Sequence, residues 1–363
     1  MINKSIDGSQ DARGYIPCLF KNDLEWVLET ARDDFLQLRG ERIFFTGGTG
    51  FIGSWFLECL CYADQALGLK VHTTVLSRDP ASFATRFPHL ADEPSIKLVA
   101  GDVRTLVPDG NRYGSVIHAA TDASAKLNQE NPLLMADTIV EGTRRVLDFA
   151  RSTGARRLLM LSSGGVYGKF MPGVTHVAED SFGGPDPLDS YYTYSESKRM
   201  AELLCAIYAR QFGLEIPVAR VFALIGPRLP LDIHFAAGNF IRDGLAGGPI
   251  RVAGDGVAMR SYLYAADLIV WLLAIFARGQ SGRAYNVGSD QGISIKELAE
   301  TVATVFPNGP IVEIGGCASA SNPVNYYVPD VARARIELGL NVVTPLAESL
   351  GRTVSWLQQN HVN

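Results

Sequence analysis

The chain has 363 residues, of which 47% are apolar and 20% charged, and its formal net charge is −5. This balance is typical of a globular enzyme and gives no ground for expecting a nucleic-acid partner or an anionic membrane surface. No stretch approaches the roughly 18 uninterrupted apolar residues of a membrane span. The first twenty residues lack the apolar core of a signal peptide.

The cysteine pattern bears on metal binding and on location. Five cysteines are scattered along the chain: Cys18, Cys59, Cys61, Cys205 and Cys317. None has a cysteine or histidine partner at zinc spacing, so we expect reduced thiols, no metal site and a cytoplasmic protein.

The N-terminal region divides into two parts. Residues 1–18 show no periodic pattern, whereas apolar residues recur at helical spacing from Asp23 to Leu38. We therefore predict an N-terminal extension, residues 1–40, that contains one helix. The sequence leaves its function open.

A glycine-rich turn follows the first predicted strand, residues 41–45, and precedes a predicted helix with apolar spacing from Ile52. A strand, a tight turn and a helix N-terminus form a site for a dinucleotide pyrophosphate. In this interpretation Gly47 permits the turn, Gly50 lets the backbone approach phosphate, and Gly53 lets the helix pack on the sheet. The predicted cofactor-binding residues here are Gly47, Thr49, Gly50, Phe51, Ile52 and Gly53.

The end of the second predicted strand, residues 70–76, bears on the choice of cofactor. It continues into Ser77, Arg78 and Asp79. A small polar residue with an arginine accommodates the 2′-phosphate of NADP(H), whereas an acidic residue at the strand end binds the ribose hydroxyls of NAD(H). Ser77 and Arg78 favour NADP(H), and the nearby Asp79 leaves NAD(H) open.

Three more strands are predicted at residues 96–100, 115–120 and 157–161, with a helix over 131–150. His118 lies in the second of these strands. We interpret it as a buried histidine with satisfied hydrogen bonds rather than a catalytic group.

The chemistry is predicted to reside in Ser163, Tyr194 and Lys198. Tyr194 and Lys198 are four residues apart at the start of a helical run, so they share one helix face. A nearby ammonium favours phenolate and lowers the pKa of a tyrosine, which makes it a usable proton carrier. A serine hydroxyl across the site can hold the same substrate oxygen while hydride moves to or from a nicotinamide.

The spacing of the turn and the order of these parts resemble the extended short-chain dehydrogenase/reductases, specifically the NAD(P)-dependent nucleotide-sugar epimerase/dehydratase family. The likeness covers residues 41–358. It implies an α/β fold: a Rossmann doubly wound parallel sheet with a smaller C-terminal α/β substrate-binding domain. The implied division is a Rossmann domain at 41–222 plus part of 250–290, and a mainly substrate-binding domain at 223–363.

The resemblance also implies roles for further residues. Asp102 and Val103 would form the adenine-contacting turn, Ala119 and Ala120 would lie against the cofactor, and Lys198 would hold the nicotinamide ribose. Ser163 and Tyr194 would contact a nucleotide-sugar substrate together with Asn239 and with Arg260, whose guanidinium suits a diphosphate. The helices at 131–152 and 190–213 would form a homodimer interface.

Two departures from the family pattern narrow the expected reaction. Gly164 and Gly165 stand where the 4,6-dehydratases and decarboxylases of the family carry an acidic residue, and Ala223 stands in place of the usual Asn. Since glycine cannot move a proton, we expect redox chemistry at carbon 4 of a nucleoside-diphosphate sugar, as a 4-ketoreductase or a 4-epimerase. A 4,6-dehydratase or decarboxylase is the alternative, and a non-catalytic dinucleotide-binding protein is a further one.

Overall fold

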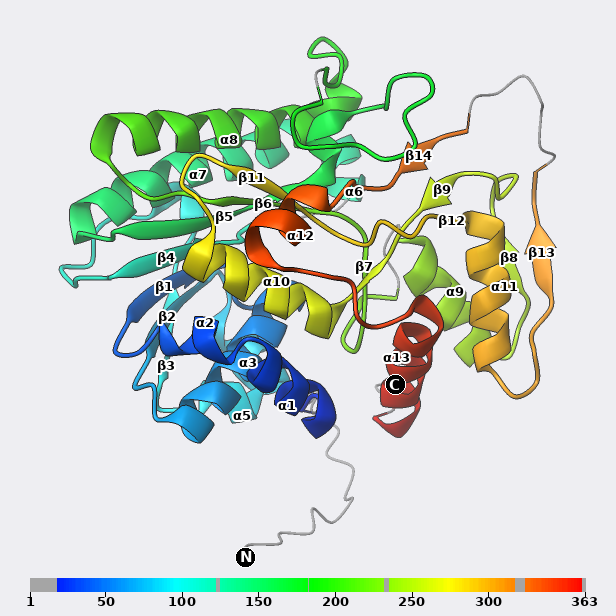
Figure 1. Ribbon diagram of the computed structural model, residues 1–363, viewed down its shortest axis with the longest axis horizontal. Coiled ribbons are helices and arrows are strands. Elements are labelled where there is room, and N and C mark those ends of the chain that lie inside the picture. The colour runs from blue at the N-terminus through cyan, green and yellow to red at the C-terminus, as the bar shows by residue number, and fades with distance from the viewer. Residues whose placement is uncertain (1–17, 122–124, 182, 232–234, 317–323, 361–363) are drawn as a thin grey trace, which may run out of the picture.

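Seven parallel strands form the central sheet of the computed structural model, which describes residues 18–121, 125–181, 183–231, 235–316 and 324–360 (Figure 1). Their spatial order is β11-β6-β5-β4-β1-β2-β3. In chain order they are β1 (Arg42–Thr46), β2 (His72–Ser77), β3 (Ile96–Ala100), β4 (Ser115–His118), β5 (Arg157–Ser163), β6 (Val218–Val221) and β11 (Ala284–Val287). The strand order reverses between β1 and β4, which is the switch point of a doubly wound sheet, and the predicted Rossmann fold is confirmed.

Helices cover both faces of this sheet, as Figure 1 shows. Phe44 packs on Phe149 with ring centroids 4.3 Å apart, while the next residue, Phe45, packs on Phe56 of the opposite layer at 5.6 Å. Alternate residues of a strand point to opposite faces, so both layers are anchored by one short apolar strand. The helices of this part are α3 (Phe51–Leu67), α4 (Pro80–Arg86), α5 (Pro88–Ala91), α6 (Ala125–Glu130), α7 (Pro132–Thr153), α8 (Thr193–Phe212) and α10 (Ala265–Arg278).

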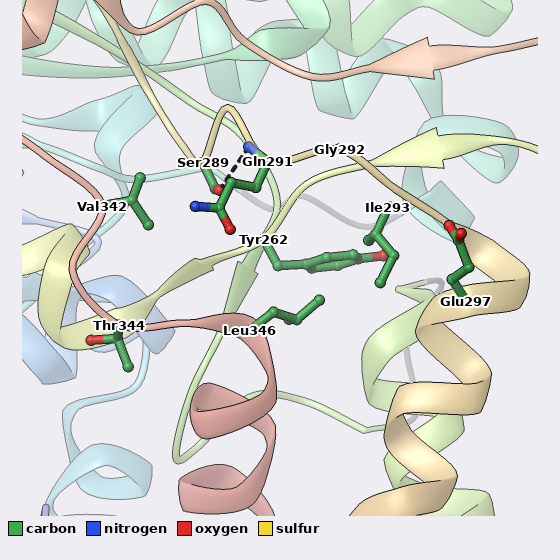
Figure 2. A pocket seen from close by; sticks show the side chains of 9 residues that line it. All are labelled: Tyr262, Ser289, Gln291, Gly292, Ile293, Glu297, Val342, Thr344 and Leu346. Carbon is green, nitrogen blue, oxygen red and sulfur yellow. Dashed lines mark hydrogen bonds between the residues drawn. The ribbon is translucent and has the colours of Figure 1, made fainter.

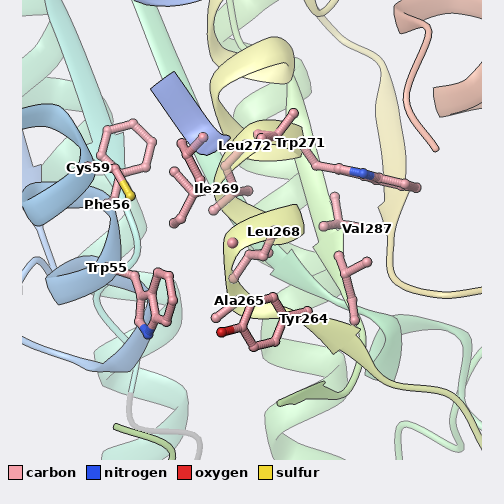
Figure 3. Close-up of a cluster of buried hydrophobic side chains, with 14 of the residues drawn as sticks. Trp55, Phe56, Cys59, Tyr264, Ala265, Leu268, Ile269, Trp271, Leu272 and Val287 are labelled. Carbon is pink, nitrogen blue, oxygen red and sulfur yellow. The ribbon is translucent and has the colours of Figure 1, made fainter. Parts of the chain in front are cut away.

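The core on one face forms between α3 and α10 (Figure 3). Trp55 of α3 is fully buried, and its indole N–H donates to the Pro227 carbonyl at 2.8 Å. Truncating such a tryptophan to alanine costs about 3–5 kcal/mol. This packing fixes the start of α3, and with it the glycine-rich turn.

A second group of elements lies to the right of the large sheet in Figure 1. Its short strands form a β10-β7 pair, a β12-β9-β14 sheet and a β13-β8 pair. The elements are β7 (Leu224–Ile225), α9 (Ala236–Leu245), β8 (Ile250–Val252), β9 (Met259–Arg260), β10 (Leu263–Tyr264), β12 (Ile293–Ser294), α11 (Ile295–Val305), β13 (Val312–Ile314), β14 (Tyr326–Tyr327) and α13 (Leu346–Gln359). The helix between the last two, α12 (Ala332–Leu338), packs instead beside β11 and α10 of the large sheet.

The predicted N-terminal helix is two helices, α1 (Lys21–Thr30) and α2 (Arg32–Leu36), which meet at Ala31. Ala31 leaves the helical conformation with φ −105° and ψ 20°, so the prediction of one continuous helix is wrong. Residues 1–17 of the predicted extension lie outside the described residues.

The first and last helices are joined by buried charge. Asp23 of α1 is 1% exposed and accepts hydrogen bonds from the Tyr264 hydroxyl, at 2.7 Å, and from Arg352 of α13. Trp356 of α13 donates to the Cys18 carbonyl at 3.2 Å. The described part of the N-terminal extension therefore connects α13 to the side of the large sheet that α3 and α10 cover.

Among the helices of the described ranges, none combines the length and apolar character that crossing a bilayer requires.

Candidate active site

The turn between β1 and α3 is shaped for close approach. Gly47 has φ +79°, and a Cβ built on it would lie 2.4 Å from the Ala119 carbonyl carbon. A Cβ on Gly53 would lie 2.4 Å from the Gly47 oxygen. Gly53 therefore lets α3 pack against the glycine-rich turn, whereas we had expected it to let the helix pack against the sheet. Only glycine fits at either position.

The N-terminus of α3 suits an anion. Its N-cap is Gly50, and no side chain in the described part of the chain caps it. Phe51 and Ile52 supply the first backbone N–H groups of the helix, and Thr49 precedes them, each half-buried. Free N–H groups and the helix dipole favour a pyrophosphate here. The tight turn and uncapped helix fit a dinucleotide.

At the end of β2, the three polar residues have separate surroundings. Ser77 is buried, and its hydroxyl accepts from the Asp79 N–H at 3.2 Å. The Asp79 carboxylate accepts from Ser82 N–H at 2.9 Å and so caps α4. Arg78 is exposed. The nearest carboxylate is therefore engaged in a helix cap, while the arginine is accessible.

The next two strand ends carry the predicted adenine and nicotinamide contacts. The Asp102 carboxylate is held by Arg104, with Nη2 donating to Oδ2 at 2.7 Å, and this hydrogen bonding holds the pKa of Asp102 at about 2. Val103 is buried, and a Cβ on Gly142 of α7 would lie 2.8 Å from its side chain. Val103 thus packs on α7.

Ala119 and Ala120 continue β4 and are half-buried beside the turn. The Ala119 N–H donates to the Thr46 carbonyl at 2.9 Å, which extends the β1–β4 pairing to the turn. Behind them His118 is 3% exposed, with its two ring nitrogens 2.8 Å from the Thr46 hydroxyl and 3.0 Å from the Thr143 hydroxyl. Burial lowers its pKa to about 3, so the predicted structural histidine is confirmed.

The structure brings Ser163, Tyr194 and Lys198 together. Ser163 ends β5, and Tyr194 and Lys198 lie in the first turns of α8. The Lys198 ammonium donates to the Thr121 hydroxyl at 2.8 Å and to the Leu161 carbonyl at 2.9 Å. Two of its three N–H groups are thus fixed. Thr121 was not predicted, because only the fold brings it to α8.

The pKa of Tyr194 shifts in the opposite direction from the one predicted. Burial raises the pKa of Tyr194, and a hydrogen bond with Ser163 opposes the change. Burial lowers the pKa of Lys198 to about 8. The expected lowering of the Tyr194 pKa is not found, because desolvation of the phenol outweighs the effect of its neighbours. At neutral pH Tyr194 is a proton donor.

Of the two glycines after Ser163, Gly164 leaves no room for a side chain, whereas a side chain at Gly165 would need only a small shift of its neighbour. A Cβ on Gly164 would lie 2.7 Å from the Phe222 ring, and one on Gly165 would lie 3.1 Å from the Ser195 hydroxyl. Phe222 is itself buried. The space that a carboxylate needs at residue 164 is therefore filled by an aromatic ring.

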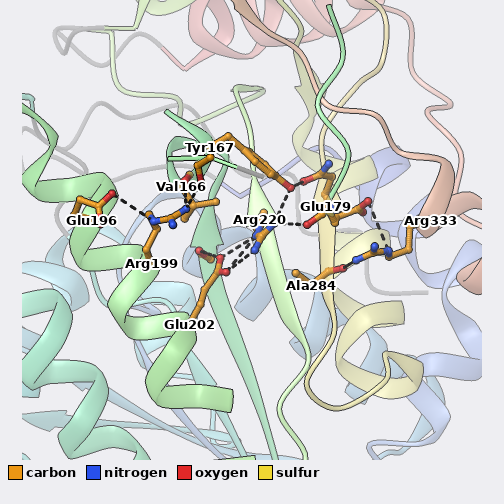
Figure 4. A network of polar contacts seen from close by, with 12 residues as sticks. Val166, Tyr167, Glu179, Glu196, Arg199, Glu202, Arg220, Ala284 and Arg333 are labelled. Atoms are coloured by element: carbon orange, nitrogen blue, oxygen red, sulfur yellow. Dashed lines mark hydrogen bonds and ion pairs between the residues drawn. The ribbon is translucent and has the colours of Figure 1, made fainter. Parts of the chain in front are cut away.

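A polar network around Glu202 and Arg220 (Figure 4) also engages the other serine, Ser162. Ser162 donates to Glu202 at 2.5 Å, away from Ser163, and Arg220 donates to the same carboxylate at 2.7 Å. Arg220 also donates to the Tyr167 hydroxyl at 2.8 Å. These pairs satisfy buried charges and fix the ends of β5 and β6, so we assign them a structural role.

The two predicted substrate contacts come from the second group of elements. Asn239 lies in α9, where its carbonyl oxygen accepts from Arg242 at 3.2 Å. Arg260 ends β9 and donates to the Met259 and Asn325 carbonyls at 2.7 and 3.0 Å. The loop that leads into α9, residues 229–235, is described only in part, since 232–234 lie outside the described residues.

One residue that the sequence did not single out joins the site. Tyr327 of β14 lies opposite Arg260 in the β9–β14 register. Its ring packs on Phe222 with centroids 4.8 Å apart, and it interacts with Ser163. No local motif marks Tyr327, because its position depends on strand pairing.

Two other polar clusters lie outside the predicted set of site residues, and the first adjoins Arg260, since Ile293 in its wall pairs with Arg260 in the β9–β12 register. A cavity of about 400 Å³ is lined by Tyr262, Gln291, Glu297, Thr344 and other residues, none of which is a predicted site residue (Figure 2). Cys18, Glu58 and His89 place possible ligand atoms within 4.8 Å of one another. Because Arg228 forms an ion pair with Glu58 and the Leu19 N–H donates to it at 2.7 Å, we assign this cluster a structural role.

Comparison with known proteins agrees with this geometry. The model of the NAD dependent epimerase/dehydratase family matches residues 43–288. The chain belongs to this family. The resemblance drawn from its motifs is therefore confirmed.

Curated relatives of this chain are named as decarboxylases. UDP-glucuronic acid decarboxylase 1 of Xenopus tropicalis is 30% identical over 319 residues, covering 88% of this chain and 72% of that protein. UDP-glucuronic acid decarboxylase 6 of Arabidopsis thaliana is 31% identical over 309 residues, covering 85% and 86%. This family member therefore shares most of its length with named decarboxylases.

Solved structures give the same fold. DesIV, a dTDP-glucose 4,6-dehydratase of Streptomyces venezuelae with NAD and TYD bound, superposes with a TM-score of 0.73 at 26% identity, covering 88% of this chain and 98% of that chain. A UDP-galactose 4-epimerase superposes with a TM-score of 0.69 at 26% identity, covering 88% and 99%. Membership of this family and these structural similarities indicate an NAD-dependent enzyme that acts on nucleotide sugars.

Proposed function

We propose that this protein is an oxidoreductase that acts at carbon 4 of a nucleoside-diphosphate sugar, as a 4-ketoreductase or a 4-epimerase. The observation that carries the proposal is the pairing of Ser163 and Tyr194 beside two residues without side chains, Gly164, whose Cβ position meets the Phe222 ring, and Gly165. Elimination or loss of a carboxyl group needs further acid/base groups near the neighbouring carbons. None follows Ser163.

The nicotinamide dinucleotide, when bound, supplies hydride transfer. The turn at Gly47 and the first turn of α3 would hold its pyrophosphate, and Lys198 its nicotinamide ribose. Tyr194 donates its hydroxyl proton to the 4-oxygen of the sugar, and Ser163 orients that oxygen by a hydrogen bond. Because burial raises the pKa of Tyr194, its hydroxyl is protonated at neutral pH, as protonation of the 4-oxygen requires in both reactions.

We further propose NADP(H) as the cofactor, with NAD(H) as the alternative. The exposed Arg78 is available for a 2′-phosphate, whereas the Asp79 carboxylate caps α4. DesIV, by contrast, was solved with NAD.

A 4,6-dehydratase or decarboxylase is the second candidate. The names of the relatives that cover most of the chain favour it. It requires a carboxylate from another part of the chain. Glu202, which lies nearby, is held by Arg220 and Ser162.

We also propose a cytoplasmic homodimer, with the domain division at 41–222 plus part of 250–290, and 223–363. Three apolar side chains at helical spacing on α8 support the dimer: Met200, Leu203 and Ile207 are 42%, 54% and 42% exposed. A monomer in sedimentation at micromolar concentration would contradict the dimer.

The first experiment adds nucleotide-linked 4-keto-6-deoxy sugars to the purified protein with NADPH or NADH and follows absorbance. Stoichiometric oxidation of the cofactor establishes a ketoreductase. A 4-epimerase is tested with UDP-glucose instead, because carbon 4 of a ketone has no configuration; conversion of UDP-glucose into its 4-epimer with no net change of the cofactor establishes an epimerase. Release of carbon dioxide from a UDP-uronate, or of a 4-keto sugar from a UDP-hexose, would establish the second candidate.

The matching variant is Tyr194→Phe. We expect turnover to fall by about 10²–10⁴-fold, the usual contribution of a positioned general acid, while dinucleotide binding is retained. Tyr191→Phe, at a 70% exposed residue of the preceding turn, is the control and should behave as wild type. Undiminished activity of Tyr194→Phe would leave the non-catalytic binding protein as the better interpretation.

A further inference from the structure

The half-buried residue Thr121, which follows β4, contacts the buried amine of Lys198 from α8. The Lys198 ammonium donates to the Thr121 hydroxyl at 2.8 Å and to the Leu161 carbonyl at 2.9 Å. In the described part of the chain no other group accepts a hydrogen bond from this ammonium, and Lys198 is only 3% exposed. Because an ammonium has three N–H groups, one is left for a ligand.

The Thr121 hydroxyl is itself oriented by the backbone. It donates its proton to the Ala120 carbonyl at 2.7 Å. A hydroxyl group has one proton to donate and two lone pairs that accept, so the oxygen of Thr121 acts toward Lys198 only as an acceptor. The backbone carbonyl of Leu161 can also only accept. Both partners of the lysine therefore stabilise its charged form.

The charged groups around Lys198 do not hold the ammonium in place of these acceptors. Burial lowers the pKa of Lys198, and Glu202 and Cys205 of the same helix oppose the change. The Glu202 carboxylate is engaged by an arginine of β6. From β4, His118 faces the lysine as a neutral ring, since burial lowers its pKa to about 3, and burial also raises the pKa of Tyr194. Among the described residues, Thr121 is thus the one side chain that accepts from this ammonium.

We propose that Thr121 is a positioning residue that holds the side chain of Lys198 as an ammonium ion in the place where it binds the nicotinamide ribose. The backbone carbonyl of Leu161 is present whatever side chain that residue carries, so the Thr121 hydroxyl is the part of the arrangement that a substitution can remove. The link to the ribose rests on the proposed function, whereas the contact that keeps Lys198 charged does not.

The first measurement follows the charge of Lys198 without cofactor or substrate. The free energy of unfolding is compared, from about pH 6 to about pH 9.5, between each protein and its Lys198→Met counterpart. In wild type this difference begins to change near pH 8, where the buried ammonium loses its proton. Thr121→Val keeps the branched shape but lacks the acceptor, so we expect the change to begin about one pH unit lower. Thr121→Ser keeps the hydroxyl and should behave as wild type.

The second measurement tests the link between Lys198 and the ribose. The affinity for NADP⁺ is divided by that for 2′,5′-ADP, which carries the same 2′-phosphate but lacks the nicotinamide ribose; NAD⁺ and ADP form the corresponding pair. A pKa about one unit lower reduces the charged fraction of Lys198 at about pH 8 by about fivefold. We therefore expect this ratio in Thr121→Val to fall by about fivefold at about pH 8 and to return to the wild-type value at about pH 6.

Thr301→Val is the control, because the Thr301 hydroxyl donates to the Glu297 carbonyl within α11, at 2.7 Å, and takes no part in binding Lys198. It should change neither measurement. An unfolding difference that still begins to change near pH 8 in Thr121→Val would overturn the assignment.

A change that begins about one unit lower, with an unchanged ratio of affinities, would support the contact with Lys198 and overturn the link to the ribose. If wild type bound none of these nucleotides, the proposed function would fall. The pH dependence of unfolding would still decide whether Thr121 keeps Lys198 charged, so the two failures are distinguishable.

Discussion

The large sheet presents its site residues at the ends of strands of five and seven residues, β1 and β5, whereas the small sheet presents Arg260 and Tyr327 from strands of only two residues. On the first side, each functional residue lies within a contiguous motif whose strand, turn and helix fold together. On the second side, the residues meet because distant segments pair. The first side is therefore positioned by local folding, whereas the second depends on the correct pairing of distant segments.

The largest effect should come from the contiguous side. Gly47→Ala places a Cβ 2.4 Å from the Ala119 backbone and at φ +79°, so both strain and overlap must be relieved. We expect a loss of more than about 3 kcal/mol in the free energy of unfolding and at least about 100-fold weaker dinucleotide binding. Denaturant unfolding and fluorescence titration with NADPH measure the two effects.

Gly40→Ala separates strain from overlap. Gly40 has a similar φ of +73°, but no atom lies within 4 Å of its Cβ position. It should cost only about 1 kcal/mol and leave dinucleotide binding intact. Equal losses in both variants would show that the approach of Gly47 to Ala119 is unimportant and would weaken the contrast between the two sides.

The buried lysine should give an intermediate effect with a defined pH dependence. The pKa of Lys198 is lowered to about 8 in the folded protein from an ordinary 10.5, so above pH 8 the unfolded chain binds more protons. Its burial therefore costs stability near neutral pH, and this cost is relieved as pH rises. We expect the free energy of unfolding of Lys198→Met, relative to wild type, to decrease by about 2 kcal/mol between about pH 8 and pH 9.5.

The difference in unfolding free energy between Lys198→Met and wild type cancels the contributions of other titrating groups, because both proteins contain them. His89, for which burial is outweighed by Cys18 and Glu58, has its pKa raised to about 9 and works in the opposite direction, but it is present in both proteins. Lys126→Met, at a side chain that is 79% exposed, is the control and should show no such change. A constant difference between Lys198→Met and wild type over this range would mean that Lys198 titrates as an exposed lysine.

The smallest effect is expected at the exposed strand end. Arg78→Ala should weaken NADPH binding by about tenfold, equivalent to ~1.4 kcal/mol, and leave NADH binding unchanged, because only NADPH carries the 2′-phosphate. Arg210→Ala, at an exposed residue of α8, controls for net charge. An equal loss for both cofactors would assign Arg78 to the dinucleotide in general and would remove its preference for NADP(H).

The site residues that could be predicted from the sequence are those in contiguous motifs, and those that could not are brought in by distant segments. The strand ends, the turn at Gly47, and the Ser163, Tyr194 and Lys198 group were accessible because each depends on residues close in sequence. Tyr327 and Thr121 were not, since nothing local marks a residue that reaches the site through a strand pair or another helix. The break at Ala31 was also missed, because the apolar spacing continues across it.

The direction of the Tyr194 pKa was wrong for a different reason. The sequence shows that a lysine lies one turn away, but it does not show how deeply the phenol is buried. Charge proximity can be inferred from spacing on a helix, whereas desolvation depends on everything that packs around the group.

The contact between Asp23 and Arg352 has a consequence for the order of assembly. Asp23 is buried, and its cationic partner lies in the last helix, close to the end of the chain. During synthesis on the ribosome, the first helix is complete long before this arginine has emerged from the exit tunnel. The first helix therefore acquires its counter-charge only after the chain between the two partners, 329 positions apart, has been made, so that α1 is stabilised later than the sheet whose strands lie between them.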